Sequence, residues 1–553
     1  MPPLFKIGGS AMSLLTDAWM PVRDRSGKRR WIAPSELTSP DLIAFDADRA
    51  DFNGALAQFA IGLLSTHAPL NKARDWERWF ASPPDASKLQ SWWEGNIAYF
   101  TYDGDGARFM QDHALAAKAD FGISGLLIDS PGENAIKNNS DHFVKRGRIE
   151  RLCPHCAITA LLTLQINAPA GGAGHRTGLR GGGPLTTLLA CEPARSLWHD
   201  LWLNVMEPPE RDAHGGDIKK FAPHFTFPWL APVEAIQPDQ GETNPVQTHP
   251  MHIFWAMPRR IRLDFDSTVE GTCDICHRTH SGLLTQYATA PYGFNYKGPW
   301  DHVLSPYYQL KGDWLPLHPQ PGGFGYRHWL PWLVGVSDDK ASQRPARVVA
   351  HFRTSHRERQ AGATLSLWAF GFDMDNMKAR CWYEARLPVY SLEDCGPSEI
   401  KRLQFTLQSW LAGARDSVYV LRSAVKTAWF SGEARGDYSA VDAAFWNRTE
   451  AAFYELLRQL IHAIRSGASD VDLEGLGQSW LNTLQQANFA LFDDVFVGAG
   501  AIDRSNPRRV AAANKLLRAT MFGEKLRKTL NLPVEPAKPA ANRQSKTQHE
   551  QEA

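Results

Sequence analysis

The chain has 553 residues and a formal net charge of +1, from 60 basic and 59 acidic side chains. A polypeptide of this length exceeds what one hydrophobic core organises, so we expect two or three domains. Hydrophobic residues make up 43% of the sequence and charged residues 22%, which excludes a wholly disordered or fibrous protein. The balanced charge also argues against a surface coated with nucleic acid on all sides, although a local basic groove is compatible with it.

The first part of the chain mixes short strand-like and helical patterns. We expect residues 1–11 to be an N-terminal extension and residues 12–396 to form a large mixed α/β domain. Within this domain, runs such as His252–Trp255 and Arg347–His351 are β-rich and alternate with helical stretches and glycine or proline breaks. The polar segment 131–140 has the composition of a mobile loop.

After Gly396 the pattern changes to long helices, expected at about residues 398–429, 438–466, 471–493 and 506–530. Short, glycine-containing links between them favour an antiparallel four-helix bundle over residues 397–531. Residues 532–553 read as a disordered tail. The predicted fold class is therefore α+β: a large mixed α/β N-terminal domain followed by an all-α four-helix bundle.

The sharpest chemical signal is a pair of CxxC motifs. Cys153 and Cys156 form the first, Cys273 and Cys276 form the second, and the 116 residues from 157 to 272 separate them. Each motif presents two thiolates to one ion, so two motifs complete a closed tetrahedral Cys₄ site for Zn²⁺. A closed site leaves no coordination position for substrate. We therefore predict a structural zinc that clips two distant segments of the mixed domain together.

Three histidines lie near these motifs, and any of them is an alternative zinc ligand: His155, His277 and His280. Four of the seven cysteines fall in the two motifs, which favours metal binding in a reducing compartment over disulfides. No run reaches the roughly 18 apolar residues of a membrane span, and the N-terminus lacks a secretory signal pattern. We expect a cytoplasmic protein without a membrane partner.

Basic and glycine-rich segments flank the first CxxC motif. Phe143, Lys145 and Arg146 precede it, and a glycine-rich stretch, residues 171–183, follows it. Glycines allow the backbone to approach a polyanion or a base edge, and Arg176 and Arg180 would supply phosphate partners. A plain flexible loop is the alternative interpretation of this stretch.

Two further segments are less specific. The alternation in Arg259–Arg262 is typical of a half-exposed strand with a solvated arginine face. Residues 373–380 resemble a turn, in which Asp373 and Asp375 are either a metal-binding pair or, more commonly, capping groups, and Met377 is a flexible side chain able to wedge into a base stack. A search for hydrolase, metalloprotease, nucleotide-binding and helicase motifs gives nothing, so enzymatic chemistry has little support.

Taken together, several motifs resemble the CasA family. They are the opening segment Leu14–Arg23, the double CxxC, the block Gly178–Leu189 (GLRGGGPLTTLL) and the closing helical segment around Leu516–Thr520. CasA proteins are large subunits of the type I-E CRISPR surveillance complex, Cascade. The resemblance extends from about residue 12 to 531 in the same order.

The resemblance implies a non-catalytic subunit that recognises the protospacer-adjacent motif (PAM) in duplex DNA, mainly from the minor groove. It also implies that the subunit starts strand separation and provides a docking surface for a recruited helicase–nuclease in antiviral defence. The implied partners are guide RNA, target DNA, the backbone subunits, the small-subunit dimer and the guide-processing endoribonuclease.

By position, the family's zinc ligands correspond to the four named cysteines, and its PAM-contacting glycine loop falls on Gly171, Gly172, Ala173 and Gly174. The mobile loop that approaches the guide RNA ends at Phe143. The family's lysine finger aligns with Pro291, so Lys297 is the nearest cation. The wedge falls on Asp375–Lys378, with Asn376 or Met377 at its tip and Lys378 beside it.

Two other classes of protein share parts of this pattern. Zinc-stapled nucleases of the HNH type combine a double CxxC with nearby histidines, but their motifs lie within roughly 50 contiguous residues. A zinc-bearing scaffold that binds only protein is the other alternative, and it predicts no contact with DNA.

Overall fold

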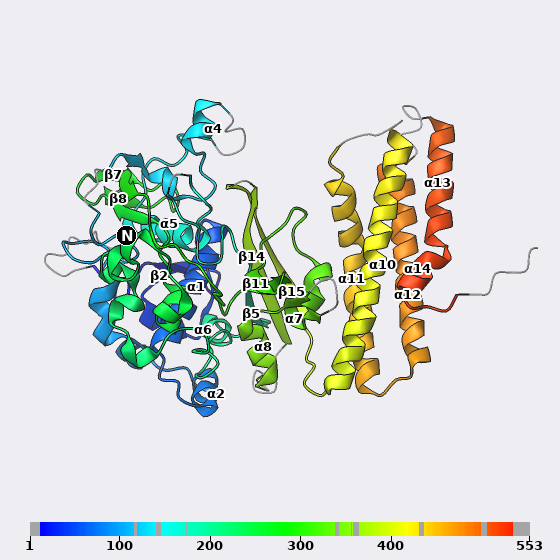
Figure 1. The fold of residues 1–553 in the computed structure, drawn as a ribbon, viewed down its shortest axis with the longest axis horizontal. Helices are drawn as coiled ribbons and strands as arrows, with labels where there is room; N and C mark the ends of the chain where they lie inside the picture. Colours follow the sequence, from blue (N-terminus) through cyan, green and yellow to red (C-terminus); the bar gives the residue numbers. More distant parts are fainter. Residues whose placement is uncertain are drawn as a thin grey trace, which may run out of the picture. The chain divides into compact units, whose positions relative to one another are not determined.

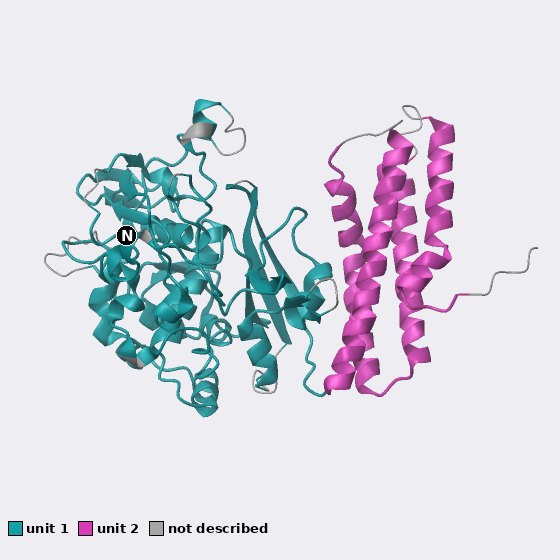
Figure 2. Cartoon of the chain, viewed as in Figure 1, with its two compact units in different colours: residues 1–394 teal, residues 395–553 magenta. Residues whose placement is uncertain are grey.

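The computed structural model describes residues 12–115, 119–139, 145–172, 174–337, 342–355, 357, 364–375, 377–430, 436–498 and 506–534. The predicted N-terminal extension and most of the predicted tail lie outside these residues, as do Phe143, Ala173 and Asn376. The chain divides into two compact units, residues 1–394 and residues 395–553 (Figure 2). The first mixes helices and strands and the second is helical, which confirms the predicted mixture of an α/β part and a C-terminal helical part.

The first unit has its strands in several small sheets (Figure 1). In the described residues these have the strand orders β2-β1-β3, β15-β14-β5, β4-β9-β6, β7-β8 and β11-β10-β13-β12. The strands are β1 Met20–Asp24, β2 Arg29–Ile32, β3 Leu42–Phe45, β4 Phe121–Gly122, β5 Thr186–Glu192, β6 Arg260–Leu263, β7 Val269–Thr272, β8 Thr279–Leu283, β9 Gln286–Ala290, β10 Tyr307–Leu310, β11 Asp313–Pro316, β12 Val336–Ser337, β13 Ser342–Arg344, β14 Thr364–Asp375 and β15 Lys378–Val389.

Helix α1 (Ala50–His67) of this unit is buried along nearly its whole length. Phe59 on α1 makes edge-on contacts with the rings of Trp19, Phe109 and Trp255, so aromatic packing organises the core. Among the described residues, the other α-helices of this unit are α2 Ala73–Ala81, α3 Ala86–Ser91, α4 Glu133–Lys137, α5 Pro154–Asn167, α6 Leu197–Trp202, α7 Trp329–Leu333 and α8 Arg347–Thr354.

Two expected strands are helices, so those predictions were wrong. Pro250 begins a 3₁₀ helix, Pro250–Phe254, where His249 accepts a hydrogen bond from the Met251 amide at 3.1 Å. Proline at the first position presets the helical φ angle and needs no amide partner. In α8, the buried positions Val348, Val349 and Phe352 follow helical spacing, which the two adjacent valines disguised as strand propensity.

Two other segments partly match expectation. The strand predicted around Arg259–Arg262 exists as β6, with Ile261 and Leu263 buried and Arg260 and Arg262 half-exposed. Arg259, however, is 8% exposed, so the idea that it lies on a solvated face was wrong. The expected loop 131–140 contains the short helix α4.

In the part of the helical unit that the structure describes, the helices are α10 Pro397–Trp429, α11 Ser439–Arg465, α12 Asp470–Ala490 with a π-helical continuation Leu491–Phe496, α13 Pro507–Met521 and α14 Glu524–Thr529 (Figure 1). Its core includes stacked rings of Trp410 and Trp480, and Phe453 meets Trp480 edge-on. The predicted fourth helix breaks at Gly523, which precedes α14. Leu532 is buried, so the packed structure extends beyond the expected limit of residue 531.

Candidate functional site

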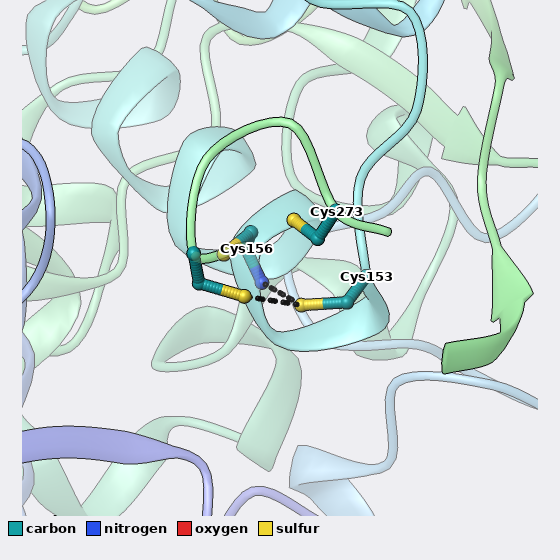
Figure 3. Close-up of side chains that lie close together, drawn as sticks. Cys153, Cys156 and Cys273 are labelled. Carbon is teal, nitrogen blue, oxygen red and sulfur yellow. Dashed lines mark hydrogen bonds between the residues drawn. The ribbon is translucent and has the colours of Figure 1, made fainter. Parts of the chain in front are cut away.

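The four cysteines of the two CxxC motifs meet in one cluster. The sulfur atoms of Cys153, Cys156, Cys273 and Cys276 all lie within 4.8 Å of one another, and the Cys153 and Cys276 sulfurs are 3.7 Å apart. Figure 3 shows the labelled side chains converging from two chain segments. Sulfurs of a tetrahedral site with Zn–S bonds of about 2.3 Å would be about 3.8 Å apart, so this donor set fits Zn²⁺.

Local sequence shapes each half of the cluster. Cys153 caps α5, and its sulfur accepts a hydrogen bond from the Cys156 amide at 3.5 Å, with Pro154 at the first helical position. In the second half, the His277 amide donates to the Cys273 carbonyl at 3.0 Å, and His277 has a φ of +56°. Both turns therefore fold the two thiols of a motif toward the same point.

Backbone hydrogen bonds hold the two halves side by side. Leu152, directly before the first motif, and Leu284, which follows β8, exchange amide–carbonyl bonds of 2.9 and 2.8 Å. The Asp274 carboxylate accepts from the amides of Glu150 and Arg151 at 2.7 and 2.9 Å. The cluster is thus a clip between segments that are far apart in sequence.

Crowding of the four sulfurs shifts their pKa values in opposite directions. Hydrogen bonding from Cys153 lowers the pKa of Cys273, whereas hydrogen bonding with Cys153 raises the pKa of Cys156. A divalent cation would hold all four as thiolates and remove this conflict. Among the described residues, the metal-type cluster contains only the cysteines, and the nearby His155 is a buried ring whose pKa burial lowers to about 3.

The predicted glycine loop begins just beyond the other end of α5. The Gly171 amide bonds to the His175 carbonyl, and the His175 amide bonds to the Gly172 carbonyl, both at 3.2 Å. Gly172 and Gly174 have φ values of +81° and +78°, which disfavour any larger residue, and a Cβ on Gly172 would meet nothing within 4 Å. Gly172 therefore presents bare, exposed backbone.

Two walls support this loop from inside. Arg259 donates to the Pro169 carbonyl, and its guanidinium lies where a Cβ on Gly171 would be. On the other side, a Cβ on Gly174 would lie 2.6 Å from Pro291 Cβ, and the Tyr292 amide donates to the Gly174 carbonyl at 2.8 Å. The close approach of these walls explains why glycine occupies positions 171 and 174.

Arg180 does not lie on the surface of this loop. It is 4% exposed, and its guanidinium donates to Thr186 Oγ1 at 3.0 Å, Ser305 Oγ at 2.9 Å and Gln58 Oε1 at 2.5 Å. Desolvation lowers its pKa to about 10, so it stays protonated at neutral pH. The expectation that Arg180 contacts phosphate is therefore corrected: its side chain braces the GLRGGG segment from within the core.

The predicted wedge lies at the tip of a β-hairpin. β14 and β15 pair from Leu365–Val389 to Asp375–Lys378, so the chain reverses between Asp375 and Lys378. Met377 has a φ of +71° and is 53% exposed, and Lys378 is also exposed.

Acidic residues near this tip serve as braces. Arg380 donates to Asp373 Oδ1 at 2.6 Å and lies 3.5 Å from Asp375 Oδ2. These contacts commit the two carboxylates to a salt bridge across the hairpin. Asp373 and Asp375 are therefore structural groups in this arrangement, which disagrees with the metal-binding alternative.

The remaining candidates have different surroundings. Lys145 and Lys297 are exposed, Arg146 is exposed and donates to Asn139 Oδ1 at 3.0 Å, and Arg176 is half-exposed. The sequence pattern placed Arg259 on a strand and indicated no role for Tyr292. No local pattern predicts the positive φ of Tyr292, and both residues come close to the glycine loop only in the folded chain.

Comparison with known proteins identifies the family. Residues 13–491 match the family model of the CRISPR-associated protein Cse1. The chain belongs to the Cse1 family. This confirms the resemblance to CasA that the sequence motifs indicated, since solved relatives carry both names.

Solved Cse1-type structures share the fold over nearly all of the chain. CasA of Thermus thermophilus has a TM-score of 0.67 at 15% identity, covering 93% of this chain and 100% of that one. Thermobifida fusca Cse1 has a TM-score of 0.68 at 14% identity, covering 94% and 98%. A chain of a structure described as a CRISPR RNA-guided surveillance complex has a TM-score of 0.61 at 15% identity, covering 93% and 99%. Among the described residues, every helix is too short or too polar to cross a membrane.

Proposed function

We propose that this Cse1-family protein is the non-catalytic large subunit of a type I-E Cascade complex, and that it recognises the PAM in duplex DNA. In this role it starts strand separation for guide RNA pairing and offers a docking surface to a recruited helicase–nuclease. Its other partners are the backbone subunits, the small-subunit dimer and the guide-processing endoribonuclease. Family membership and the likeness to a chain of an RNA-guided surveillance complex support this proposal.

The observation that carries the DNA-reading role is the geometry of the glycine loop. Gly172 exposes backbone with no side chain, while Arg259 and Tyr292 support the loop from both sides. A narrow minor groove admits such a backbone, and its largely degenerate pattern of acceptors suits amide donors. Tight support limits movement of the loop, so its contacts with a base edge cost little ordering entropy.

The hairpin of β14 and β15 supplies the proposed wedge. Met377 is exposed at the tip, and Arg380 stiffens the strands behind it through Asp373. An apolar side chain inserted between base steps unstacks them at a cost of roughly a few kcal/mol, which subsequent guide–target pairing offsets. Asn376 and Lys378 flank Met377 in this proposal.

The Cys₄ cluster has an architectural role in the same proposal. α5 runs from the cluster toward the glycine loop, and the chain after the second motif passes through β9 to Tyr292. Zn²⁺ at the cluster would hold both of these chain segments at the end where they begin. The metal then supports PAM reading indirectly, without contact with DNA.

The decisive experiment replaces Gly172 and Gly174 with bulky residues and measures target capture by the assembled complex. We expect loss of PAM-dependent capture of duplex DNA, because a side chain would block the groove. The same complex should still bind a single-stranded target or a duplex already melted beside the PAM. Equal losses on all targets would show that the loop only supports the fold, and the recognition role would be wrong.

A nicking assay with added divalent metal separates this proposal from the nuclease alternative. We expect no metal-dependent nicking by the purified chain. A scaffold that binds only protein would leave the capture of duplex DNA by the complex unchanged in every loop variant.

A further inference from the structure

The conformation of Tyr292 is unusual for a residue of its type. Its φ is +63°, a region that bulky side chains rarely adopt, and its side chain is 43% exposed. Strained backbone of this kind persists where surrounding structure enforces it, and such positions gather at functional sites.

The neighbours fix the ring against the glycine loop. The Tyr292 amide donates to the Gly174 carbonyl at 2.8 Å, and a Cβ on Gly174 would lie 3.1 Å from the Tyr292 ring. The Arg176 guanidinium carbon lies 5.8 Å from the ring centre, within the range of a cation–π contact. The glycine loop, the Tyr292 ring and the Arg176 guanidinium thus lie together in one cluster, the tyrosine cluster.

The tyrosine cluster has hydrogen-bonding groups without a partner in the protein. Within the described part of the chain, no group bonds to the Tyr292 hydroxyl, and no carboxylate forms an ion pair with Arg176. A phenol can donate to purine N3 or pyrimidine O2 and can accept from the guanine N2 amino group, which are the polar groups of the minor groove. A free guanidinium beside it is a phosphate ligand.

We propose that Tyr292 is a specificity-determining residue for the PAM, which reads one base pair through its hydroxyl while Arg176 pairs with the adjacent phosphate. This inference rests on the proposed function of the glycine loop. It adds a side chain to the readout, because a backbone amide at Gly172 distinguishes A·T from G·C pairs at most. The strained φ is then the means by which the ring is aimed beside the loop.

The test uses the assembled complex with guide RNA and a library of duplex targets randomised at the PAM. Tyr292→Phe keeps the ring and removes the hydroxyl, and Tyr419→Phe, at an exposed tyrosine of the helical unit, is the matched control. We expect Tyr292→Phe to lower discrimination at one PAM position by about 3- to 10-fold, the usual effect of one hydrogen bond. Binding to a target already melted beside the PAM should not change.

Arg176→Met tests the phosphate contact separately. It should weaken capture of all PAM sequences by a similar factor and reduce the salt dependence of binding. A Tyr292→Phe complex with the wild-type PAM profile would overturn the inference while leaving the glycine-loop role intact. A wild-type complex that captures all PAM sequences equally would overturn both, so the two failures are distinguishable.

Discussion

The Tyr292 amide donates a hydrogen bond to the Gly174 carbonyl at 2.8 Å, although 117 positions separate the two residues in sequence. Each lies downstream of one CxxC motif. The cysteine cluster joins the two segments at one end, and this hydrogen bond joins them again near the exposed loop. Loss of the cysteine cluster should therefore disturb the folding of both segments.

Replacement of Cys153 by Ser should remove the metal and reduce the yield of folded protein. The purified wild-type chain should hold about one zinc ion, measured by elemental mass spectrometry on protein never exposed to chelators. Cys395→Ser is the matched control, because this half-buried thiol lies outside the cluster. Zinc at wild-type levels in Cys153→Ser, or none in the wild type, would contradict the prediction.

Two arginines of one segment should behave in opposite ways. Arg180→Met leaves the oxygens of Gln58, Thr186 and Ser305 without their donor in the core, so the free energy of unfolding should fall by about 2–3 kcal/mol. Arg176→Met, on the half-exposed side, should cost less than about 1 kcal/mol. Denaturant unfolding of the two variants makes the comparison, and equal losses would show that Arg180 is not a brace.

Mild acid should destabilise the mixed unit through buried histidines. Burial lowers the pKa of His67 to about 4, and its ring lies 2.9 Å from the Leu63 carbonyl and 2.7 Å from Asn96 Nδ2. The unfolded chain, with a histidine pKa near 6.5, binds the proton first as pH falls. Stability from this group is therefore complete above about pH 6.5 and declines as pH falls toward 4, by about 2 kcal/mol at pH 5.

His67→Gln tests this prediction, since glutamine does not titrate. The slope of unfolding free energy against pH between 5 and 6.5 should fall by about one proton equivalent relative to the wild type. His113→Gln, at an exposed histidine, is the control. His277 is also exposed, but it lies next to Cys276, so its replacement could change stability through the metal cluster. An unchanged slope in His67→Gln would show that this ring takes up its proton over the same pH range in the folded and the unfolded chain, so that burial does not lower its pKa.

Removal of residues 395–553 should leave the first unit folded with its metal. The chain divides between Asp394 and Cys395, and the cysteine cluster lies wholly in the first unit. We expect zinc content to persist while assembly with partner subunits or target binding is impaired. Full assembly and interference by the shortened chain would contradict a role for the helical unit.

The sequence predicted the long helices and the metal cluster well, for physical reasons. Helical periodicity over 20–30 residues, as in α10 and α11, is a strong local signal that tertiary contacts reinforce. The spacing of the cysteine pairs reflects coordination chemistry, which depends little on the rest of the fold.

Other features depended on contacts that no local pattern records. Arg180 lies in a glycine-rich stretch that suggests exposure, yet its side chain turns into the core to meet Gln58 and Ser305. The two adjacent valines of α8 have strand propensity, but burial of one face of the segment stabilises a helix. The proposed role of Tyr292 depends on its contacts with Gly174 and Arg176, which belong to a segment far away in the sequence.

Two glycines in the long helices make room for the leucines that follow α14, so the helical unit depends on these leucines. Leu530 packs so closely over Gly413 of α10 that a Cβ there would lie 2.9 Å from Leu530 Cγ, and Leu532 similarly covers Gly477 of α12. Both leucines follow α14, so this segment closes over two hollows that glycine leaves in the long helices. A chain shortened to residue 529 should thus expose both hollows and lose cooperative unfolding of the helical unit.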